Sequence, residues 1–293
     1  MKIKNVLRTI RNLLTRKFYK NPNVLSDLDT INYLLKNKCS ISRFGDGELS
    51  IIEGTSIGFQ KANEELKNKM IEVSKVNDKN FLVCIPDIFS PKTFNKNNLV
   101  DSDFIWWKKE KFRREFLWKK YFNKTDVLGD AFISRFYLRK NDKSKVEGYV
   151  KKLKQLWDKR DIIFVEGENS RLGYRNDLFD NANSTKRILC PASNAFDNYE
   201  NILNSIKNNV QKHDLIILAL GPTATVMAYD LYKIGFQAYD LGHIDVEYEW
   251  FKMKALKKEP ILSKHVNECN SLGETKKEDL DKEYLDQIVD KLY

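Results

Sequence analysis

Two carboxylates stand two residues apart in the segment SRFGDGE, residues 42–48, just past a short strand predicted around Ile41. Oxygen ligands at positions i and i+2 of a tight turn can share one divalent cation. Mg²⁺ or Mn²⁺ held in this way bridges the phosphates of a nucleotide diphosphate and stabilises negative charge on a leaving group. The structural alternative is that Asp46 caps a helix and that Glu48 favours the helix dipole.

The residues beside this pair favour the metal interpretation. Arg43 offers a guanidinium that can pair with phosphate through two hydrogen bonds. Gly45 and Gly47 allow the backbone to approach a ligand closely. We therefore predict that Asp46 and Glu48 bind a metal ion, and that Arg43 and Asp46 contact a nucleotide.

A second polar segment, EGENSRLG at 166–173, follows an apolar run and offers carboxylates, an amide and an arginine. Because ligands bind where the strands of a parallel sheet end, Glu166 is a candidate general base. Arg171 is a candidate contact to the same nucleotide. The alternative is a polar surface loop with a turn glycine.

A third segment, LGPTAT at 220–225, carries an apolar run into a glycine and then into the start of a helix. Free N–H groups and the helix dipole make such a start a pocket for phosphate, which predicts Gly221 and Thr223 as contacts. The segment is neither a Walker A sequence nor a GxGxxG, which argues against an ATPase or a dehydrogenase. The alternative is a plain turn capped by Thr223.

A fourth segment, DLGHIDVEYEW at 240–250, places a histidine between carboxylates at the end of another apolar run. His243 is therefore a candidate metal ligand, phosphate donor or general base. Asp245 is the second candidate for the base that accepts a substrate proton. A lone histidine is also common as a structural residue.

The elements that must position these residues alternate along the second half of the chain. Apolar runs at 161–167, 187–192, 214–221 and 236–242 predict strands, and the amphipathic segments between the later three predict helices. Strands that are apolar on both faces form a parallel sheet covered on both sides. We therefore predict an α/β fold, Rossmann-like, with a mostly parallel sheet, helices on both faces and a ligand site at the carboxyl ends of the strands.

In the first half the same patterns predict further elements. The apolar run at 81–86 is typical of a buried strand, and the alternation at 131–138 also predicts a strand. Helices are expected at 101–125 and 143–160. The charged tail predicts a surface helix. We divide the chain into a basic amphipathic segment (1–25), a central domain (26–268) and a charged C-terminal helix (269–293) packed on or trailing that domain.

Composition narrows the class of protein. The chain has 293 residues, of which 42% are hydrophobic, as expected of a folded protein, and a formal charge of +10 favours anionic partners. That charge is spread along the chain and no nucleic-acid-binding motif is present, so we expect no nucleic-acid partner. Four widely spaced cysteines do not suggest a disulfide framework, which predicts a reducing compartment, the cytoplasm.

Residues 1–20 are basic and amphipathic. Their apolar members fall at helical spacing among Arg and Lys, namely Val6, Ile10, Leu13, Leu14 and Phe18. This pattern predicts a helix that either docks on its own domain or contacts an anionic membrane leaflet peripherally. The segment lacks the roughly 20 consecutive apolar residues that a spanning helix needs.

Four motifs in order resemble the GT-D-type glycosyltransferases, once grouped as a domain of unknown function. They are RFGDGEL, EGENSRLGYRNDLFDNA, ALGPTATVMAYDL and DLGHIDVEYEWF, and the resemblance runs from about residue 26 to residue 268. It implies a Rossmann-like fold distinct from other glycosyltransferase folds. It also implies a UDP-sugar donor, usually UDP-glucose, and a divalent metal at a DxE motif, which falls here on Asp46 and Glu48.

The resemblance further implies a bacterial role in glycosylating serine-rich adhesins or building surface polysaccharide. We therefore expect a hexosyltransferase that uses Mn²⁺ or Mg²⁺ and moves a sugar, with glucose as the expected hexose, from a UDP-sugar to a glycan or glycoprotein acceptor. In an inverting reaction Asp245 or Glu166 would accept the acceptor proton. The expected location is the cytoplasm, at the inner face of the membrane if residues 1–20 bind it. Another nucleotide-dependent sugar- or phosphate-transferring enzyme would use the same parts, and a basic nucleic-acid-binding protein is a further alternative.

Overall fold

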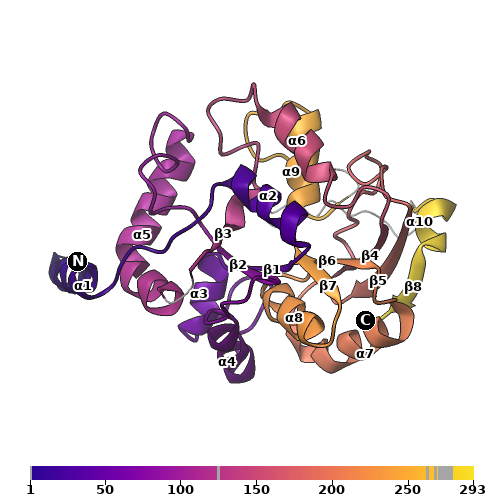
Figure 1. The fold of residues 1–293 in the computed structure, drawn as a ribbon, viewed down its shortest axis with the longest axis horizontal. Coiled ribbons are helices and arrows are strands. Elements are labelled where there is room, and N and C mark those ends of the chain that lie inside the picture. The colour runs from indigo at the N-terminus through magenta and orange to yellow at the C-terminus, as the bar shows by residue number, and fades with distance from the viewer. Residues whose placement is uncertain (1, 124–125, 262–263, 267–268, 270–279) are drawn as a thin grey trace.

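One sheet runs through the molecule. The computed structural model describes residues 2–123, 126–261, 264–266, 269 and 280–293. Within these ranges the sheet has eight strands, paired in parallel in the order β3-β2-β1-β7-β6-β4-β5-β8 (Figure 1). The strands are β1 (Ser40–Arg43), β2 (Phe81–Ile85), β3 (Gly129–Asp130), β4 (Asp161–Gly167), β5 (Ser184–Cys190), β6 (Leu215–Ala219), β7 (Gln237–Asp240) and β8 (Ile288–Lys291).

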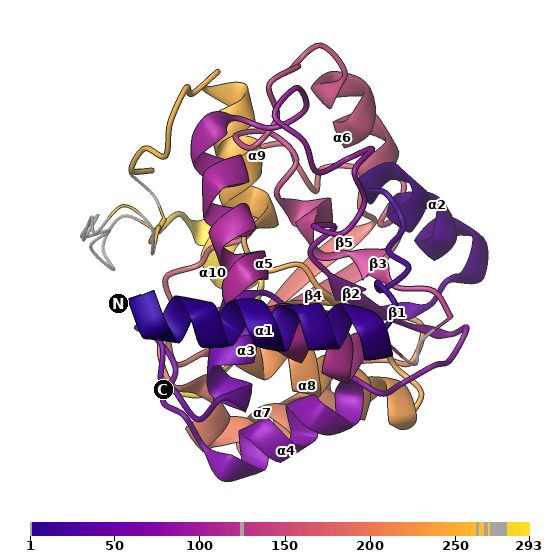
Figure 2. The same ribbon diagram turned by 90° about the vertical axis from the view of Figure 1, so that its left-hand side faces the viewer.

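Helices cover both faces of the sheet, as the sequence predicted (Figure 1). One face carries α2 (Asp27–Asn37), α6 (Val146–Lys154) and α9 (Ile244–Lys252). The other carries α3 (Asp46–Ile52), α4 (Glu64–Val73), α7 (Tyr199–Asn209) and α8 (Pro222–Lys233). Near β3, α5 (Asp101–Phe122) packs at the edge and carries α1 (Lys2–Phe18) on its outer side (Figures 1 and 2). Short 3₁₀ turns are η1 (Ala131–Ser134) and η2 (Ala195–Asn198).

The central strand β4 explains why the fold has two cores. Successive side chains of a strand point to opposite faces, so an apolar run feeds both layers. Ile163 and Val165 pack with the helices of one face, whereas Ile162 and Phe164 pack with those of the other. Every strand that the two cores share ends at the same edge of the sheet, and the segments that follow the strands meet there.

Two predicted elements differ from the structure. Residues 131–138 were expected to form a strand, but 131–134 form the 3₁₀ turn η1. The carboxylate of Asp130 accepts the N–H of Phe132 at 2.9 Å, and this local cap turns the chain where apolar alternation alone predicts extension.

The C-terminal segment also differs from the predicted charged helix over 269–293. Of that segment, the described residues 280–293 form a short helix, α10 (Lys282–Asp286), and then the edge strand β8 beside β5. Tyr284 is buried, and the N–H of Leu292 donates to the carbonyl of Leu189 at 2.8 Å. These contacts hold the segment as a strand, although its charged sequence does not by itself predict one. Residues 270–279 lie outside the described part.

Candidate functional site

The predicted metal pair lies at the carboxyl end of β1, where α3 begins. Gly45 is the N-cap of α3, and its N–H donates to Oε2 of Glu48 at 2.6 Å. The structural alternative gave the capping role to Asp46, but the structure gives it to Glu48, at the third position of the helix. Asp46 occupies the first helical position, is partly buried, and its carboxylate has no hydrogen bond or ion pair to any described residue. Asp46 thus keeps a carboxylate available for a ligand.

A buried arginine on α5 fixes the start of α3. Arg114 donates to the carbonyl of Asp46 at 3.0 Å, to Oγ of Ser50 at 2.8 Å and to Oε2 of Glu53 at 2.6 Å. The backbone of Arg114 departs from helical angles, with φ −124° and ψ 18°, so α5 kinks at this residue. We conclude that α5 sets the position of the Asp46 backbone.

The side chain of Arg43 is held by the strands beside it. Its Nε donates to the carbonyl of Asp240 at 2.6 Å and its Nη2 forms an ion pair with that residue's carboxylate at 3.1 Å. The Nη1 atom donates to Oγ of Ser134 at 2.7 Å. Gly242 lies so close that an added Cβ would fall 2.5 Å from Nη2, and its φ of +45° also favours glycine. Arg43 is therefore preorganised, and 16% of its side chain remains exposed.

Three carboxylates share the region around Arg43. Burial raises the pKa of Glu48 to about 7, and the carboxylates of Asp240 and Asp46 add to the rise. Burial also raises the pKa of Asp240, although the guanidinium of Arg43 opposes it. The raised pKa values reflect burial and the mutual repulsion of neighbouring carboxylates, and a bound cation would relieve that repulsion.

The start of α8 is covered in this structure. Gly221 has φ +55°, and an added Cβ would fall 2.6 Å from the ring of Phe59. Thr223 is fully buried and its hydroxyl donates to Oε1 of Gln60 at 3.3 Å. A phosphate reaches Gly221 and Thr223 only if the segment that carries Phe59 and Gln60 moves away.

The candidate base Glu166 lies inside the fold. It is fully buried, its Oε1 accepts from Nη1 of Arg187 at 2.5 Å, and its Oε2 accepts from the N–H of Leu172 at 2.7 Å. Arg171, in the same segment, is 3% exposed with φ +50°. The loop after β4 is thus built around the buried ion pair of Glu166 and Arg187.

Asp245, the other candidate base, is also buried. Its carboxylate pairs with Nζ of Lys264 at 2.6 Å and accepts the N–H of Gly173 at 2.8 Å. A base must reach the proton that it removes. Since Asp245 is 1% exposed in this structure, we leave it, like Glu166, out of the function proposed below.

His243 stands at the N-cap position of α9, directly after Gly242 and thus near Arg43. In the described part of the chain, the ligand atoms of His243, Asp46 and Glu48 do not all come within 4.8 Å of one another. The structure thus brings Asp46 and Glu48 together on one helical turn but does not complete a three-residue set with His243.

A different acid-histidine group lies at the opposite edge of the sheet. Oxygen and nitrogen atoms of Asp161, His213 and Asp214 all lie within 4.8 Å of one another and could hold a metal ion. Asp161 opens β4 and Asp214 precedes β6, so the group marks the amino ends of strands. Ligands of such sheets bind at the carboxyl ends, so we do not place this group in the catalytic centre.

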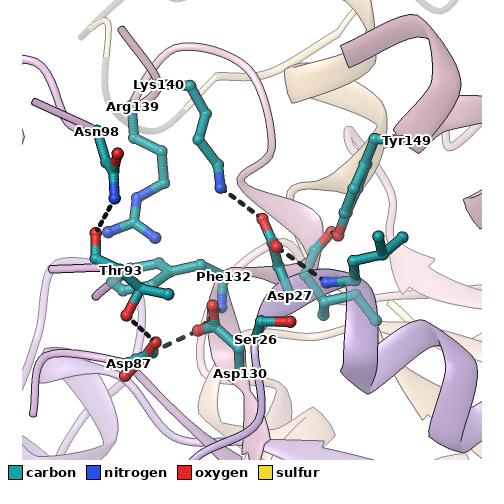
Figure 3. A network of polar contacts seen from close by, with 12 residues as sticks. Ser26, Asp27, Asp87, Thr93, Asn98, Asp130, Phe132, Arg139, Lys140 and Tyr149 are labelled. Carbon is teal, nitrogen blue, oxygen red and sulfur yellow. Dashed lines mark hydrogen bonds and ion pairs between the residues drawn. The ribbon is translucent and has the colours of Figure 1, made fainter. Parts of the chain in front are cut away.

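A cavity of about 630 Å³ opens beside η1, where β2 and β3 end. Figure 3 shows polar contacts among residues that line it, such as Asp27 with Lys140 and Asp87 with Thr93. Asp87 and Asp130 are among the residues that line it, and the N–H of Asp87 donates to Oδ1 of Asp130 at 3.3 Å. Burial raises the pKa of Asp130 to about 7, with Arg139 opposing the rise. A cavity of this size accommodates a small ligand.

The walls of this cavity mix cationic and aromatic groups. The guanidinium of Arg139 stacks on the ring of Phe132 at 3.2 Å from the centroid and pairs with Asp103 at 3.1 Å. Lys140 pairs with Asp27 at 2.6 Å (Figure 3). The turn η1 joins the cavity to the Asp46 region, because Ser134 is the residue that Arg43 contacts.

Sequence reasoning missed Asp240, Asp87 and Asp130, and the first two share one signal. Asp240 and Asp87 stand at or just beyond the carboxyl end of an apolar strand, whereas Asp130 ends the two-residue strand β3. Asp240 lay within a motif that was singled out for its histidine. An acidic residue at the end of a predicted strand would have found Asp240 and Asp87, whereas Asp130 precedes the strand predicted at 131–138 and carries no such signal.

The comparisons with known proteins agree with this geometry. The family described as "Glycosyltransferase GT-D fold" matches residues 41–269. This chain belongs to that family. In sequence it is 38% identical over 267 residues to "Probable glycosyl transferase Gly" of Streptococcus gordonii, and 34% identical over 278 residues to "Glycosyltransferase GlyD" of Streptococcus pneumoniae. The alignments cover 91% and 90% of the chain but only 38% and 32% of these relatives, so the chain spans about a third of their length.

Solved structures extend the agreement to the fold. A structure described as "A New Glycosyltransferase (DUF1792) from Streptococcus sanguinis" superposes with a TM-score of 0.84 at 36% identity, over 93% of this chain and all of that one. A second, described as a domain of unknown function 1792 with a distinct glycosyltransferase fold, gives 0.86 at 36% identity over 96% of this chain and all of that one. The predicted Rossmann-like α/β fold of GT-D type is therefore confirmed.

Proposed function

We propose that this protein is a glycosyltransferase that moves a hexose, with glucose as the first candidate, from a UDP-sugar to a hydroxyl group of a glycan or glycoprotein. The observation that carries the proposal is the partnerless carboxylate of Asp46 beside Glu48, at the carboxyl edge of a GT-D sheet. Nucleotide ligands of parallel sheets bind at this edge. The names of the related proteins support glycosyl transfer as the class of reaction.

The oxygen-only donor set of Asp46 and Glu48 suits a hard cation such as Mn²⁺ or Mg²⁺. Such an ion would neutralise charge on the departing diphosphate. Arg43 adds a fixed positive charge at the same edge, and its contacts with Asp240 and Ser134 hold it there. Arg114 keeps the backbone of Asp46 in place. These residues bind and orient the donor, and no base is assigned among them.

The cavity beside η1 is the proposed place for the acceptor sugar. Sugar hydroxyls pair with carboxylates and guanidinium groups, and sugar rings pack on flat apolar surfaces. The cavity supplies Asp130 and Arg139 for the first kind of contact and Phe136 and Tyr149 for the second. Through η1 it adjoins Arg43, so donor and acceptor would meet at the ends of β1 and β3.

The proposed setting is the glycosylation of bacterial adhesins or the synthesis of surface polysaccharide, in the cytoplasm. The chain covers only about a third of its curated relatives, so their other segments have no counterpart in this alignment. Peripheral contact with a membrane through residues 1–20 would bring the enzyme to lipid-bound acceptors, and it is argued separately below.

Release of UDP from UDP-glucose without added acceptor tests the proposal. We expect slow hydrolysis that requires Mn²⁺ or Mg²⁺, and a rise in melting temperature with UDP plus metal, because a ligand of the native state stabilises it. ATP and UDP-galactose serve as matched comparisons. Stabilisation and turnover with ATP alone would instead support a phosphate-transferring enzyme and overturn the proposal.

A further inference from the structure

The N-terminal helix α1 turns its polar side toward the domain. Asn12 and Thr15 are 3% exposed, and the amide of Asn12 donates to the carbonyl of Phe112 on α5 at 2.8 Å. Arg16 pairs with the buried carboxylate of Glu115 at 2.9 Å. A helix that docks on its own protein normally buries its apolar stripe. In α1 the contact with α5 is made by hydrogen bonds and an ion pair instead.

Helix α1 lies on the outside of the molecule (Figure 2), and its apolar side is exposed. Its large side chains are 50–71% exposed and are Val6, Leu7, Ile10, Leu13, Leu14 and Phe18. At about 100° per residue they span an arc of roughly 140°, opposite Asn12 and Thr15. This row of side chains is the exposed apolar face of α1. An exposed apolar face of this length marks a binding surface.

Basic side chains border that face. Arg11 and Arg16 are exposed on α1 beside the face, Lys17 is exposed within it, and Lys20 is exposed just after the helix ends. Arg113 on α5 lies where α1 crosses it, since its carbonyl accepts from Arg11 at 2.8 Å. On α5, Trp106 is 53% exposed. An apolar stripe flanked by Lys and Arg is typical of helices that lie in the headgroup region of anionic bilayers.

We propose that the exposed apolar face of α1 docks the protein on an anionic lipid bilayer, with the helix parallel to the membrane plane. None of the described helices has the length and apolar character needed to cross a bilayer, so the contact is interfacial. The Arg and Lys residues around this face favour an anionic bilayer over a second copy of this chain, because a second copy would place its own Arg and Lys against them. The proposal does not rest on the function proposed above.

Sedimentation of the full chain with vesicles tests the inference. Vesicles of phosphatidylcholine with about 30% phosphatidylglycerol should carry the protein down, whereas pure phosphatidylcholine vesicles should do so at least about tenfold less, since Lys and Arg gain from anionic headgroups. Raising the salt concentration should weaken the binding.

Two variants separate the apolar face from exposed apolar residues elsewhere. The triple change Ile10→Ser, Leu13→Ser and Leu14→Ser should reduce binding to anionic vesicles at least about tenfold without lowering the melting temperature, because these side chains point away from the domain. The matched control Met253→Ser with Leu256→Ser removes side chains that are 49% and 93% exposed, and should bind as the parent does.

Equal binding by the triple variant and the parent would overturn the proposal. So would an absence of parent binding to anionic vesicles. A parent that is dimeric by light scattering, does not bind vesicles and becomes monomeric in the triple variant would show that a second copy covers this face, and would overturn it as well. Donor hydrolysis should be unchanged in the triple variant, so the outcome is independent of the catalytic proposal.

Discussion

Two acidic loops look alike in sequence and differ in the structure. The loop after β1 carries Asp46 and Glu48, and the loop after β4 begins with Glu166. Asp46 has no partner among the described residues, whereas Glu166 is fully buried and paired with Arg187 at 2.5 Å. The same residue type at the same edge is thus a candidate ligand in one place and a structural anchor in the other. The role of such a carboxylate depends on whether another part of the fold places a cationic side chain beside it.

The largest expected effect tests this contrast directly. Asp46→Asn with Glu48→Gln removes the charge that would hold the cation but keeps the shape and the acceptor oxygens. We expect transfer and hydrolysis of UDP-glucose to fall at least about 100-fold, because metal stabilisation of a leaving group is worth several kcal/mol. UDP release measures this, and circular dichroism checks the fold.

Glu166→Gln is the counterpart in the other loop. Activity per folded molecule should stay close to that of the parent, because Glu166 does not reach the surface. If folded Glu166→Gln protein loses as much activity as the double variant, the loop after β4 carries chemistry and the contrast is wrong.

The second prediction concerns the buried ion pair of Asp245 and Lys264. Lys264→Met leaves the carboxylate of Asp245, which is 1% exposed, without its cation. We expect the free energy of unfolding to fall by about 3–5 kcal/mol, measured by urea denaturation. The matched control is Lys252→Met, whose partner Asp177 is 48% exposed and which should cost about 0–1 kcal/mol. Equal losses of unfolding free energy in the two variants would contradict the assignment of Asp245 and Lys264 as a buried structural pair.

The third prediction uses pH. Burial raises the pKa of Asp130 to about 7, above the usual value near 4 for an aspartate in an unfolded chain. Between these values the folded state keeps a proton that the unfolded state has lost, so stability falls as pH rises from about 4 to 7. Below pH 4 both states are protonated, and above pH 7 both are ionised, so the cost then stays constant.

Asp130→Asn removes that cost. Relative to the parent, the variant should gain on the order of 2–4 kcal/mol of stability between pH 4 and pH 8, measured by urea denaturation at each pH. Asp142→Asn, at the exposed rim of the same cavity, should show no gain of this sign, because hydrogen bonds from Ser144 lower the pKa of Asp142. A flat difference for Asp130→Asn would show that its carboxyl group is already ionised in the fold.

The smallest expected effect concerns the glycine above Arg43. Gly242→Ala places a Cβ 2.5 Å from Nη2 of Arg43 and should displace the guanidinium. We expect KM for the donor to rise about tenfold, because the donor would lose about one strong hydrogen bond from Arg43. Gly235→Ala is the control, since its φ of +86° is equally strained but nothing lies within 4 Å of the added atom. A normal KM in Gly242→Ala would show that Arg43 does not serve the donor.

Much of this fold could be predicted because its central strands are apolar on both faces. Runs such as the one at 214–221 have few alternatives to a buried parallel strand, and their alternation with helices fixes the α/β class. Two elements could not be predicted. The turn at 131–134 depends on one side-chain cap by Asp130, and β8 depends on the edge of β5 that receives it.

The sequence predicted the site only where the residues that form it lie close together along the chain. Asp46 and Glu48 lie on one turn and were found together. The partners of the buried carboxylates lie far along the chain, with Arg187 21 residues from Glu166 and Lys264 19 residues from Asp245. Spacing alone does not show that a carboxylate has been neutralised in this way. The orientation of α1 was open for the same reason.

The kink of α5 at Arg114 has a consequence for the distance between lipid and chemistry. The same short stretch of α5 receives Arg16 of α1 through Glu115 and holds the backbone of Asp46 through Arg114. If α1 rests on a bilayer, this rigid linkage works as a spacer of constant height. The height of the Asp46 edge above the headgroups would then be fixed by the contacts of α5 with α1 and α3.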